Sequence, residues 1–165
     1  MDTREVTLRR ATAADAEALW QVRIQAIRAG CCRHYAAEDI AAWVANPVPD
    51  TFPAFIAVEP FFVAEIAGQI VGFAGLKRES AELNALFVLP ELAGKGLGTR
   101  LLGSVEDAAR DLQFASLSLE SSLNAVPFYK AASYREGAQG MHLTTGRVQI
   151  PCVHMQKNLT GVDAA

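Results

Sequence analysis

Three glycines at alternate positions, Gly94, Gly96 and Gly98, are the residues whose type and spacing most directly indicate chemistry. They follow the apolar stretch 83–88, which predicts a β-strand that Pro90 ends because proline lacks a backbone donor. Glycines let backbone amides approach a ligand, and the start of the helix predicted next adds roughly half a positive charge. The stretch is therefore predicted to bind a phosphate or pyrophosphate. The simpler alternative is a turn that only joins a strand to a helix.

Two common phosphate loops do not fit this spacing. A Walker loop requires serine or threonine after its Gly-Lys pair, whereas Lys95 is followed by Gly96. The dinucleotide fingerprint G-x-G-x-x-G would require a third glycine where Thr99 stands, and Glu120 only loosely meets the position of its usual acidic partner. ATP and NAD are therefore disfavoured as ligands.

The pattern that remains, V-x-P-x-x-x-G-K-G-x-G-x-x-L-L from Val88, closely resembles the acetyl-CoA loop of the GNAT superfamily of N-acyltransferases. The family form, Arg/Gln-x-x-Gly-x-Gly/Ala, would begin at Ala93 and reach Gly96 and Gly98. Ala93 departs from the family form, which removes a side-chain contact but keeps the amides that hold the pyrophosphate.

A second stretch, residues 123–134, resembles the GNAT motif that ends in Phe-Tyr-x-x-x-Gly-Phe. Ser133 replaces the usual glycine, Tyr134 replaces the usual phenylalanine, and Ser122 stands where many relatives carry asparagine. A serine adopts positive φ less readily than glycine, so we expect either backbone strain at Ser133 or a different end to the preceding helix.

The resemblance implies an N-acetyltransferase that transfers an acetyl group from acetyl-CoA to a primary amine by direct attack in a ternary complex. It implies that the Val88 amide polarises the thioester carbonyl and that Tyr129 is the general acid near the sulfur, although Tyr129 could also be an ordinary core aromatic. The residues expected to contact the cofactor are Leu86, Phe87, Val88, Ala93, Gly94, Lys95, Gly96, Leu97, Gly98, Thr99, Asn124, Phe128 and Tyr129. The alternative function is a non-catalytic module that binds or senses acyl-CoA.

The base that deprotonates the amine has three candidates. Glu82 lies eleven residues before Ala93, where the histone-modifying branch of the family carries a catalytic glutamate, and regular strand alternation would place it on one face with Asn84 and Leu86. Glu82 could equally be an exposed carboxylate at a strand end. Glu120 ends the neighbouring predicted strand and is the second candidate, and proton loss through water alone is the third.

The segment from Cys31 to Asp39 is expected to form the acceptor side of the cleft, with His34 and Tyr35, together with Glu120, as substrate-binding residues; an ordinary interhelical loop is the alternative. Cys31, Cys32 and His34 also suggest a metal site, because thiols and imidazole are common ligands. No second pair of ligands at zinc spacing accompanies them, so no metal is expected.

Positioning these groups requires an α/β (α+β) fold, and the resemblance implies a mixed, mostly antiparallel sheet of six to seven strands flanked by about four helices. One domain is predicted over residues 1–160, with a short tail at 161–165. Strands are predicted at 6–10, 61–66, 69–76, 82–88, 115–120, 134–136 and 150–157, and helices at 13–28, 36–44, from 99 to about 112, and 122–130, while 55–58 is undecided.

Composition and charge limit the number of domains, the kinds of partner and the location that are expected. With 165 residues, 51% of them hydrophobic, the chain can bury one sizeable core. A net charge of −3 argues against a nucleic-acid binder and weakly favours a cationic or amine substrate. No signal-like or membrane-spanning apolar run occurs, and three cysteines, two of them adjacent, do not suggest a disulfide framework, so a cytoplasmic location is expected. The expected partners are a small-molecule or protein amine and, as an open alternative to a monomer, a second copy in a homodimer.

Overall fold

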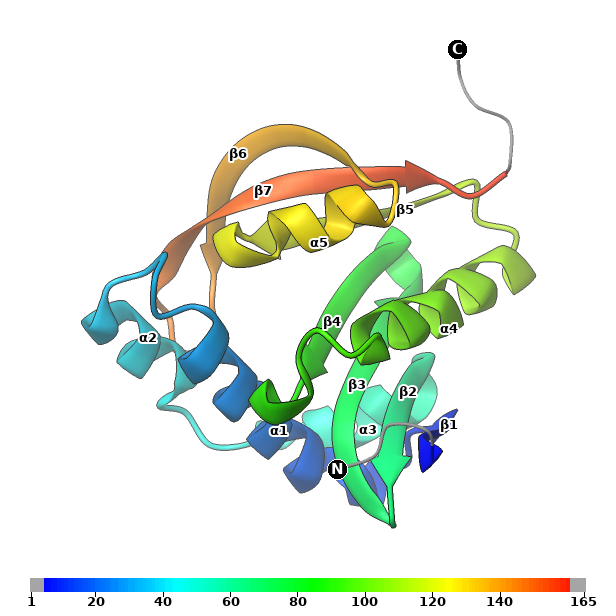
Figure 1. Cartoon of the computed structure of the whole chain (residues 1–165), viewed down its shortest axis with the longest axis horizontal. Coiled ribbons are helices and arrows are strands. Elements are labelled where there is room, and N and C mark those ends of the chain that lie inside the picture. Colours follow the sequence, from blue (N-terminus) through cyan, green and yellow to red (C-terminus); the bar gives the residue numbers. More distant parts are fainter. Residues whose placement is uncertain (1–4, 161–165) are drawn as a thin grey trace.

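The computed structural model describes residues 5–160, in which a seven-stranded sheet carries helices on both faces (Figure 1). The strands are β1 (Thr7–Arg10), β2 (Phe61–Ile66), β3 (Gln69–Lys77), β4 (Glu82–Val88), β5 (Ser116–Ser122), β6 (Arg135–Leu143) and β7 (Gln149–Asn158). The helices are α1 (Ala16–Gly30), α2 (Ala37–Val44), α3 (Phe52–Val58), α4 (Leu97–Asp111) and α5 (Val126–Ala131). Short 3₁₀ turns cover Ala13–Asp15, Arg78–Ser80, Pro90–Leu92 and Leu123–Ala125. Within the described part of the chain, no helix is long and apolar enough to cross a membrane.

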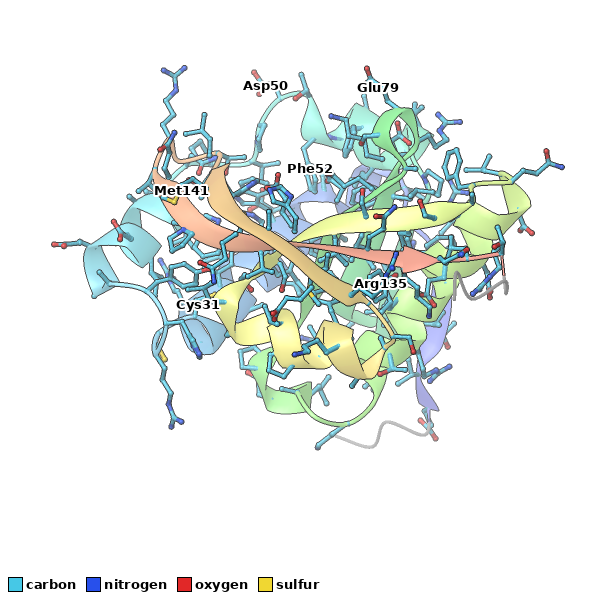
Figure 2. The ribbon with its side chains drawn as sticks, turned by 90° about the horizontal axis from the view of Figure 1, so that it is seen from above. Cys31, Asp50, Phe52, Glu79, Arg135 and Met141 are labelled. Atoms are coloured by element: carbon cyan, nitrogen blue, oxygen red, sulfur yellow. The ribbon has the colours of Figure 1, made fainter. Side chains whose placement is uncertain are left out.

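The sheet order is β1-β2-β3-β4-β5-β7-β6, and every pairing is antiparallel except that of β4 with β5. This confirms the predicted mixed, mostly antiparallel sheet. Helix α4 covers one face of β2–β4, and α3 lies behind the same strands (Figure 1). Seen from above in Figure 2, β6 and β7 cross the molecule as a ribbon, with Arg135 near one end of β6 and Met141 near the other.

The parallel pair β4 and β5 diverges almost as soon as it forms. The two strands are in register only at Glu82 and Ser118, where the Ser118 amide donates to the Ala81 carbonyl at 3.1 Å. Beyond that point β5 pairs with β7 and β4 pairs only with β3, so the two strands separate (Figure 1). This divergence leaves one edge of β4 open along most of its length.

A β-bulge in β4 corrects the expected alternation of its side chains. Leu83 pairs with Leu76 and Ala85 pairs with Gly75, which leaves Asn84 as an extra residue. Directly opposed residues of an antiparallel pair point to the same face. Glu82 therefore shares its face with Ala85 and Phe87, whereas Leu86 lies on the other face with Leu83 and Val88.

Two apolar cores hold these elements. The larger packs the sheet against α1, α3 and α4, and its fully buried side chains include Leu19, Ile56, Phe61, Phe73 and Leu101. The smaller joins α1 and α2 to β7 and contains Ile27, Cys31, Tyr35, Ile40, Trp43, Val44 and Ile150. The second core fixes the position of the α1–α2 connection, which was predicted to form the acceptor side of the cleft.

Local sequence signals explain where most helices and strands begin and end. A few of these boundaries differ from the prediction. Ala67 and Gly68 both have positive φ, as a two-residue β2–β3 hairpin requires, so the predicted turn is confirmed. Helix α1 starts at Ala16 rather than at residue 13, because Asp15 Oδ2 accepts from the Thr12 amide and holds a 3₁₀ turn first. The undecided residues 55–58 belong to α3, a fifth helix, and β6 extends to Leu143.

The end of α5 contains the strain expected at Ser133, whose φ is +75°. The Tyr134 amide donates to the Tyr129 carbonyl at 2.9 Å and the Ser133 amide to the Lys130 carbonyl at 3.0 Å, which is the Schellman arrangement. The left-handed conformation disfavours a side chain, so Ser133→Gly is expected to stabilise the fold by about 1 kcal/mol. Thermal unfolding should show a rise in Tm of about 2–4 °C. Ser133→Ala keeps the strain and serves as the control; an equal rise for both variants would contradict this explanation.

Candidate active site

A cavity of about 710 Å³ opens where β4 and β5 separate. Its walls come from β3 and β4, from the end of β5 and the turn that follows it, from the helices α1, α2, α3 and α5, and from the β6–β7 hairpin. The predicted site residues among its lining are Glu82, Leu86, Phe87, Val88, Glu120, Asn124 and Tyr129. The structure therefore brings predicted site residues from two distant stretches of sequence, 82–88 and 120–129, to one cavity.

The open edge of β4 presents amides toward the side from which β5 departs. The Leu89 amide donates to the Val71 carbonyl at 2.8 Å, which makes these two residues a hydrogen-bonded pair with β3. In an antiparallel pair such residues alternate with residues whose N–H groups point the other way. The amides of Leu86 and Val88 consequently point away from β3, into the divergence.

The glycine loop follows the end of β4 directly. Gly94 and Gly96 have φ values of +77° and +85°, which other residues rarely adopt. Gly96 caps α4, and the first hydrogen bond entering the helix runs from the Arg100 amide to the Gly96 carbonyl at 3.1 Å. The amides of Leu97, Gly98 and Thr99 therefore precede the helical ladder and can donate to an anion.

Packing around the loop sets the roles of its side chains. Leu97 is buried in the core, so only its backbone faces the loop, whereas the side chains of Ala93, Lys95 and Thr99 are exposed. A Cβ on Gly98 would lie 3.3 Å from the Phe128 ring, so this glycine lets α5 approach the start of α4 closely. Lys95 lines a second hollow of about 580 Å³ between the loop and α1, outside the main cavity.

Tyr129 lies in the first turns of α5 and is buried, yet it lines the cavity. Its ring makes edge contacts with Phe128 and Tyr134, at centroid distances of 5.1 and 5.7 Å. Among residues 5–160 its hydroxyl has no hydrogen-bond partner, whereas the Tyr134 hydroxyl donates to Glu106 at 2.8 Å. Burial raises the pKa of Tyr129 above its usual value, so the hydroxyl stays protonated and is able to donate.

The two candidate carboxylates have different surroundings. Glu120 Oε2 lies 2.7 Å from Nδ1 of His142, a residue of β6 that also lines the cavity. Glu82 is half-buried, and its carboxylate makes no hydrogen bond or ion pair with any described residue. Lys77, its partner in the β3–β4 register, lines the cavity beside it.

Asn124 and the α1–α2 connection meet at the cavity wall. The Asn124 side-chain oxygen accepts from the Cys31 thiol at 3.3 Å, and both residues line the cavity. The structure does not bring His34 or Tyr35 to the lining. His34 is exposed, and the buried Tyr35 hydroxyl donates to the Pro151 carbonyl at 2.7 Å and accepts from an amide of the turn after β5, so its polar group is used within the fold.

Sequence reasoning missed several residues that line the cavity, namely Trp20, Arg23, Trp43, Phe52, Phe55, Lys77, His142 and Thr145. For one of them, Arg23, the sequence itself contains a signal. Arg23 follows Trp20 by three positions and precedes Ile27 by four, so it interrupts the predicted apolar face of α1. A charge at a helix position that faces the core calls for an explanation.

The chain combines this order of strands with the divergence of β4 and β5 and a glycine loop at the start of α4. A family model for the acetyltransferase (GNAT) domain matches residues 31–159. The chain belongs to this family. A curated relative, an uncharacterized N-acetyltransferase of Methanocaldococcus jannaschii, is 32% identical over 88 residues, which are 46% of this chain and 39% of the relative. The present chain thus covers well under half of the length of that curated relative.

Solved structures share the GNAT fold over nearly the whole chain. A GCN5-related N-acetyltransferase from Rhodopseudomonas palustris is 24% identical, with a TM-score of 0.86, over 96% of this chain and 98% of that one. The PaiA N-acetyltransferase of Thermoplasma acidophilum, in complex with coenzyme A, has a TM-score of 0.71 at 21% identity, over 93% and 98% of the two chains. The putative acetyltransferase YncA of Salmonella typhimurium, with its cofactor acetyl-CoA, has a TM-score of 0.67 at 24% identity, over 97% of both.

Proposed function

We propose that this GNAT domain transfers an acetyl group from acetyl-CoA to a primary amine by direct attack in a ternary complex. The observation that carries the proposal is the composition of the main cavity. Outward-pointing β4 amides line one space with a tyrosine hydroxyl and a carboxylate, neither of which has a hydrogen-bond partner within residues 5–160. These are the donor, acid and base that acyl transfer to an amine requires.

The residues of the glycine loop suit the diphosphate of coenzyme A. Positive φ at Gly94 and Gly96 turns the chain, and the amides that precede the α4 ladder supply donors at the positive end of a helix of 15 residues. The structural neighbours described with coenzyme A or acetyl-CoA support this choice of ligand. With its diphosphate at the loop, the acyl arm would extend along the open edge of β4 toward the cavity.

The chain's own groups would then act in sequence. A carboxylate removes a proton from the ammonium group, so that the nitrogen has a lone pair with which to attack the thioester carbon. The Val88 amide donates to the carbonyl oxygen, on which negative charge develops as the C–N bond forms. When the C–S bond breaks, the Tyr129 hydroxyl protonates the departing thiolate. The nitrogen then loses its second proton, which restores the Tyr129 hydroxyl, and the proton taken up by the carboxylate returns to solvent.

Glu82 is the proposed base, because its carboxylate has no partner among residues 5–160, whereas Glu120 is held by His142. Glu82→Gln keeps the shape but cannot accept the proton, so kcat is expected to fall by roughly 10- to 100-fold. Steady-state kinetics of Glu82→Gln and Glu120→Gln with one amine would compare the two, with acetyl-CoA affinity measured for each. A larger loss for Glu120→Gln would transfer the role, and little change in either would favour proton loss through water.

The proposed activity can be tested without knowing the acceptor. Calorimetric titration with acetyl-CoA measures binding, and release of free thiol from acetyl-CoA with a panel of small amines and peptide N-termini measures transfer. Acetyl-CoA binding with amine-dependent thiol release is expected. Binding without release on any amine would favour the acyl-CoA-binding module instead, and absence of binding would exclude both functions.

A further inference from the structure

Arg23 is a charged residue buried in the wall of the acceptor side of the cavity. It lies on α1 with only 8% of its surface exposed, between the apolar side chains of Trp20 and Ile27. Removing a guanidinium from water has a large free-energy cost unless other groups compensate the charge and its donors. The contacts of Arg23 therefore indicate what the cavity is built to hold.

The internal contacts of Arg23 are few and carry no negative charge. Its Cζ lies 4.3 Å from the centre of the Trp20 ring, and Nη2 donates to Thr145 Oγ1 at 3.2 Å and to the Trp43 carbonyl at 3.5 Å. Nη1 is buried and has no hydrogen-bond partner within residues 5–160. None of the described carboxylates lies within ion-pair distance of this guanidinium.

Other buried charged residues of the described chain have oppositely charged partners, so a buried guanidinium without an ion pair is unusual here. Asp15 is paired with Arg9 at 2.8 Å, and Glu106 accepts from both Lys157 and Tyr134. Burial lowers the pKa of Arg23 to about 10, which still leaves it cationic at neutral pH. The wall of the cavity therefore carries a positive charge that no described carboxylate neutralises.

The remaining donors of Arg23 suit a carboxylate. A guanidinium has five N–H donors in one plane, and the two on Nη1 of Arg23, which have no acceptor within residues 5–160, can donate to a carboxylate. Lys77, the other lysine or arginine of the lining, stands opposite the proposed base Glu82 in the strand register. The surrounding Trp43, Phe52 and Phe55 supply apolar surface between polar groups.

We propose that the acceptor is an amino acid whose carboxylate binds Arg23 while its amine reaches the thioester beside Glu82. This inference rests on the proposed acetyl transfer and specifies its substrate class. The two signs of charge match the two ends of such a zwitterion, and the aromatic side chains match an apolar side chain. A carboxylate bound there would supply the counter-charge and hydrogen-bond acceptors that Arg23 lacks within residues 5–160.

Kinetics on matched substrates test this with the unaltered protein. For leucine and phenylalanine, thiol release from acetyl-CoA is compared among the amino acid, its carboxamide and its decarboxylated amine. The amino acid is expected to have a kcat/KM roughly 100-fold above that of both analogues, because the analogues leave the buried guanidinium unpaired. Equal or faster turnover of the analogues would overturn the inference while supporting acetyl transfer. Preference for phosphoethanolamine over every amino acid would also overturn it, by identifying a phosphate as the anion.

Variants of Arg23 connect the preference to this residue. In Arg23→Met the ratio of kcat/KM between amino acid and carboxamide is expected to fall to near one, and Arg23→Lys should restore only part of it because lysine lacks the planar fork. Arg28→Met, which alters an exposed arginine of the same helix, is the matched control and should keep the wild-type ratio. An unchanged ratio in Arg23→Met would refute the assignment. If acetyl-CoA does not bind the unaltered protein, the proposed function fails instead.

Discussion

Replacing Tyr129 by phenylalanine is expected to lower kcat about 100-fold while the affinity for acetyl-CoA stays nearly the same. The Tyr129 ring fills a buried site against Phe128 and Tyr134, and phenylalanine preserves those contacts. The hydroxyl has no partner among residues 5–160, so its removal leaves no orphaned group inside the protein. The loss should therefore appear in the chemical step, and steady-state kinetics together with calorimetric titration of acetyl-CoA would show it.

Tyr134→Phe is the matched control for this prediction. Its hydroxyl donates to Glu106, which also pairs with Lys157 at 3.0 Å, so its loss should reduce stability by about 1–3 kcal/mol with little effect on kcat. Because burial raises the pKa of Tyr129, the wild-type rate should not decline through loss of this acid near the pH at which an exposed tyrosine ionises. Equal kcat values for Tyr129→Phe and the parent enzyme would remove Tyr129 from the mechanism.

Replacing Gly96 by valine is expected to weaken acetyl-CoA binding about tenfold or more. Gly96 has a φ of +85°, and a β-branched residue in the left-handed region costs on the order of 1–2 kcal/mol. The chain can relieve this strain only by turning the peptide units at the start of α4, which moves the donors that are proposed to hold the diphosphate. Since 1.4 kcal/mol corresponds to a tenfold change in affinity, titration with acetyl-CoA should resolve the effect.

Gly68→Val separates this effect from a general loss of stability. Gly68 also has positive φ, at +78°, is exposed, and has no heavy atom within 4 Å of an added Cβ, as is true of Gly96. It lies in the β2–β3 hairpin and is not among the residues predicted to contact the cofactor. Similar destabilisation of both variants with weaker acetyl-CoA binding only in Gly96→Val is expected. Unchanged affinity in Gly96→Val would count against the loop as the diphosphate site.

Several features could be predicted because neighbouring residues determine them. The β2–β3 turn follows from Ala67-Gly68, and the left-handed residues of the cofactor loop coincide with glycines at 94 and 96. The strain at Ser133 was expected because a serine stands where the α5 end needs positive φ. In each case backbone sterics within a few residues decide the conformation, so spacing along the chain suffices.

The contacts at the cavity wall were predicted poorly because distant segments of the chain form them. The partner of Glu120 is His142, which reaches it only because β6 and β5 both flank β7. Tyr35 was assigned to the substrate, yet its hydroxyl bonds to β7 and to the turn after β5. No local pattern encodes either contact, since each depends on the order of strands in the sheet.

By itself, the sequence determined the loop that is suited to a diphosphate, the strand and helix on either side of it, and the GNAT family, because these depend on short-range backbone geometry. Only the tertiary structure decided which side chains meet in the cavity. The bulge at Asn84 reversed the face of Leu86 relative to Glu82, and the packing of α1 against α2 buried Arg23 with no counter-ion among the described residues. Such outcomes depend on pairing and packing between distant segments, which balance burial against hydrogen bonding over the whole domain.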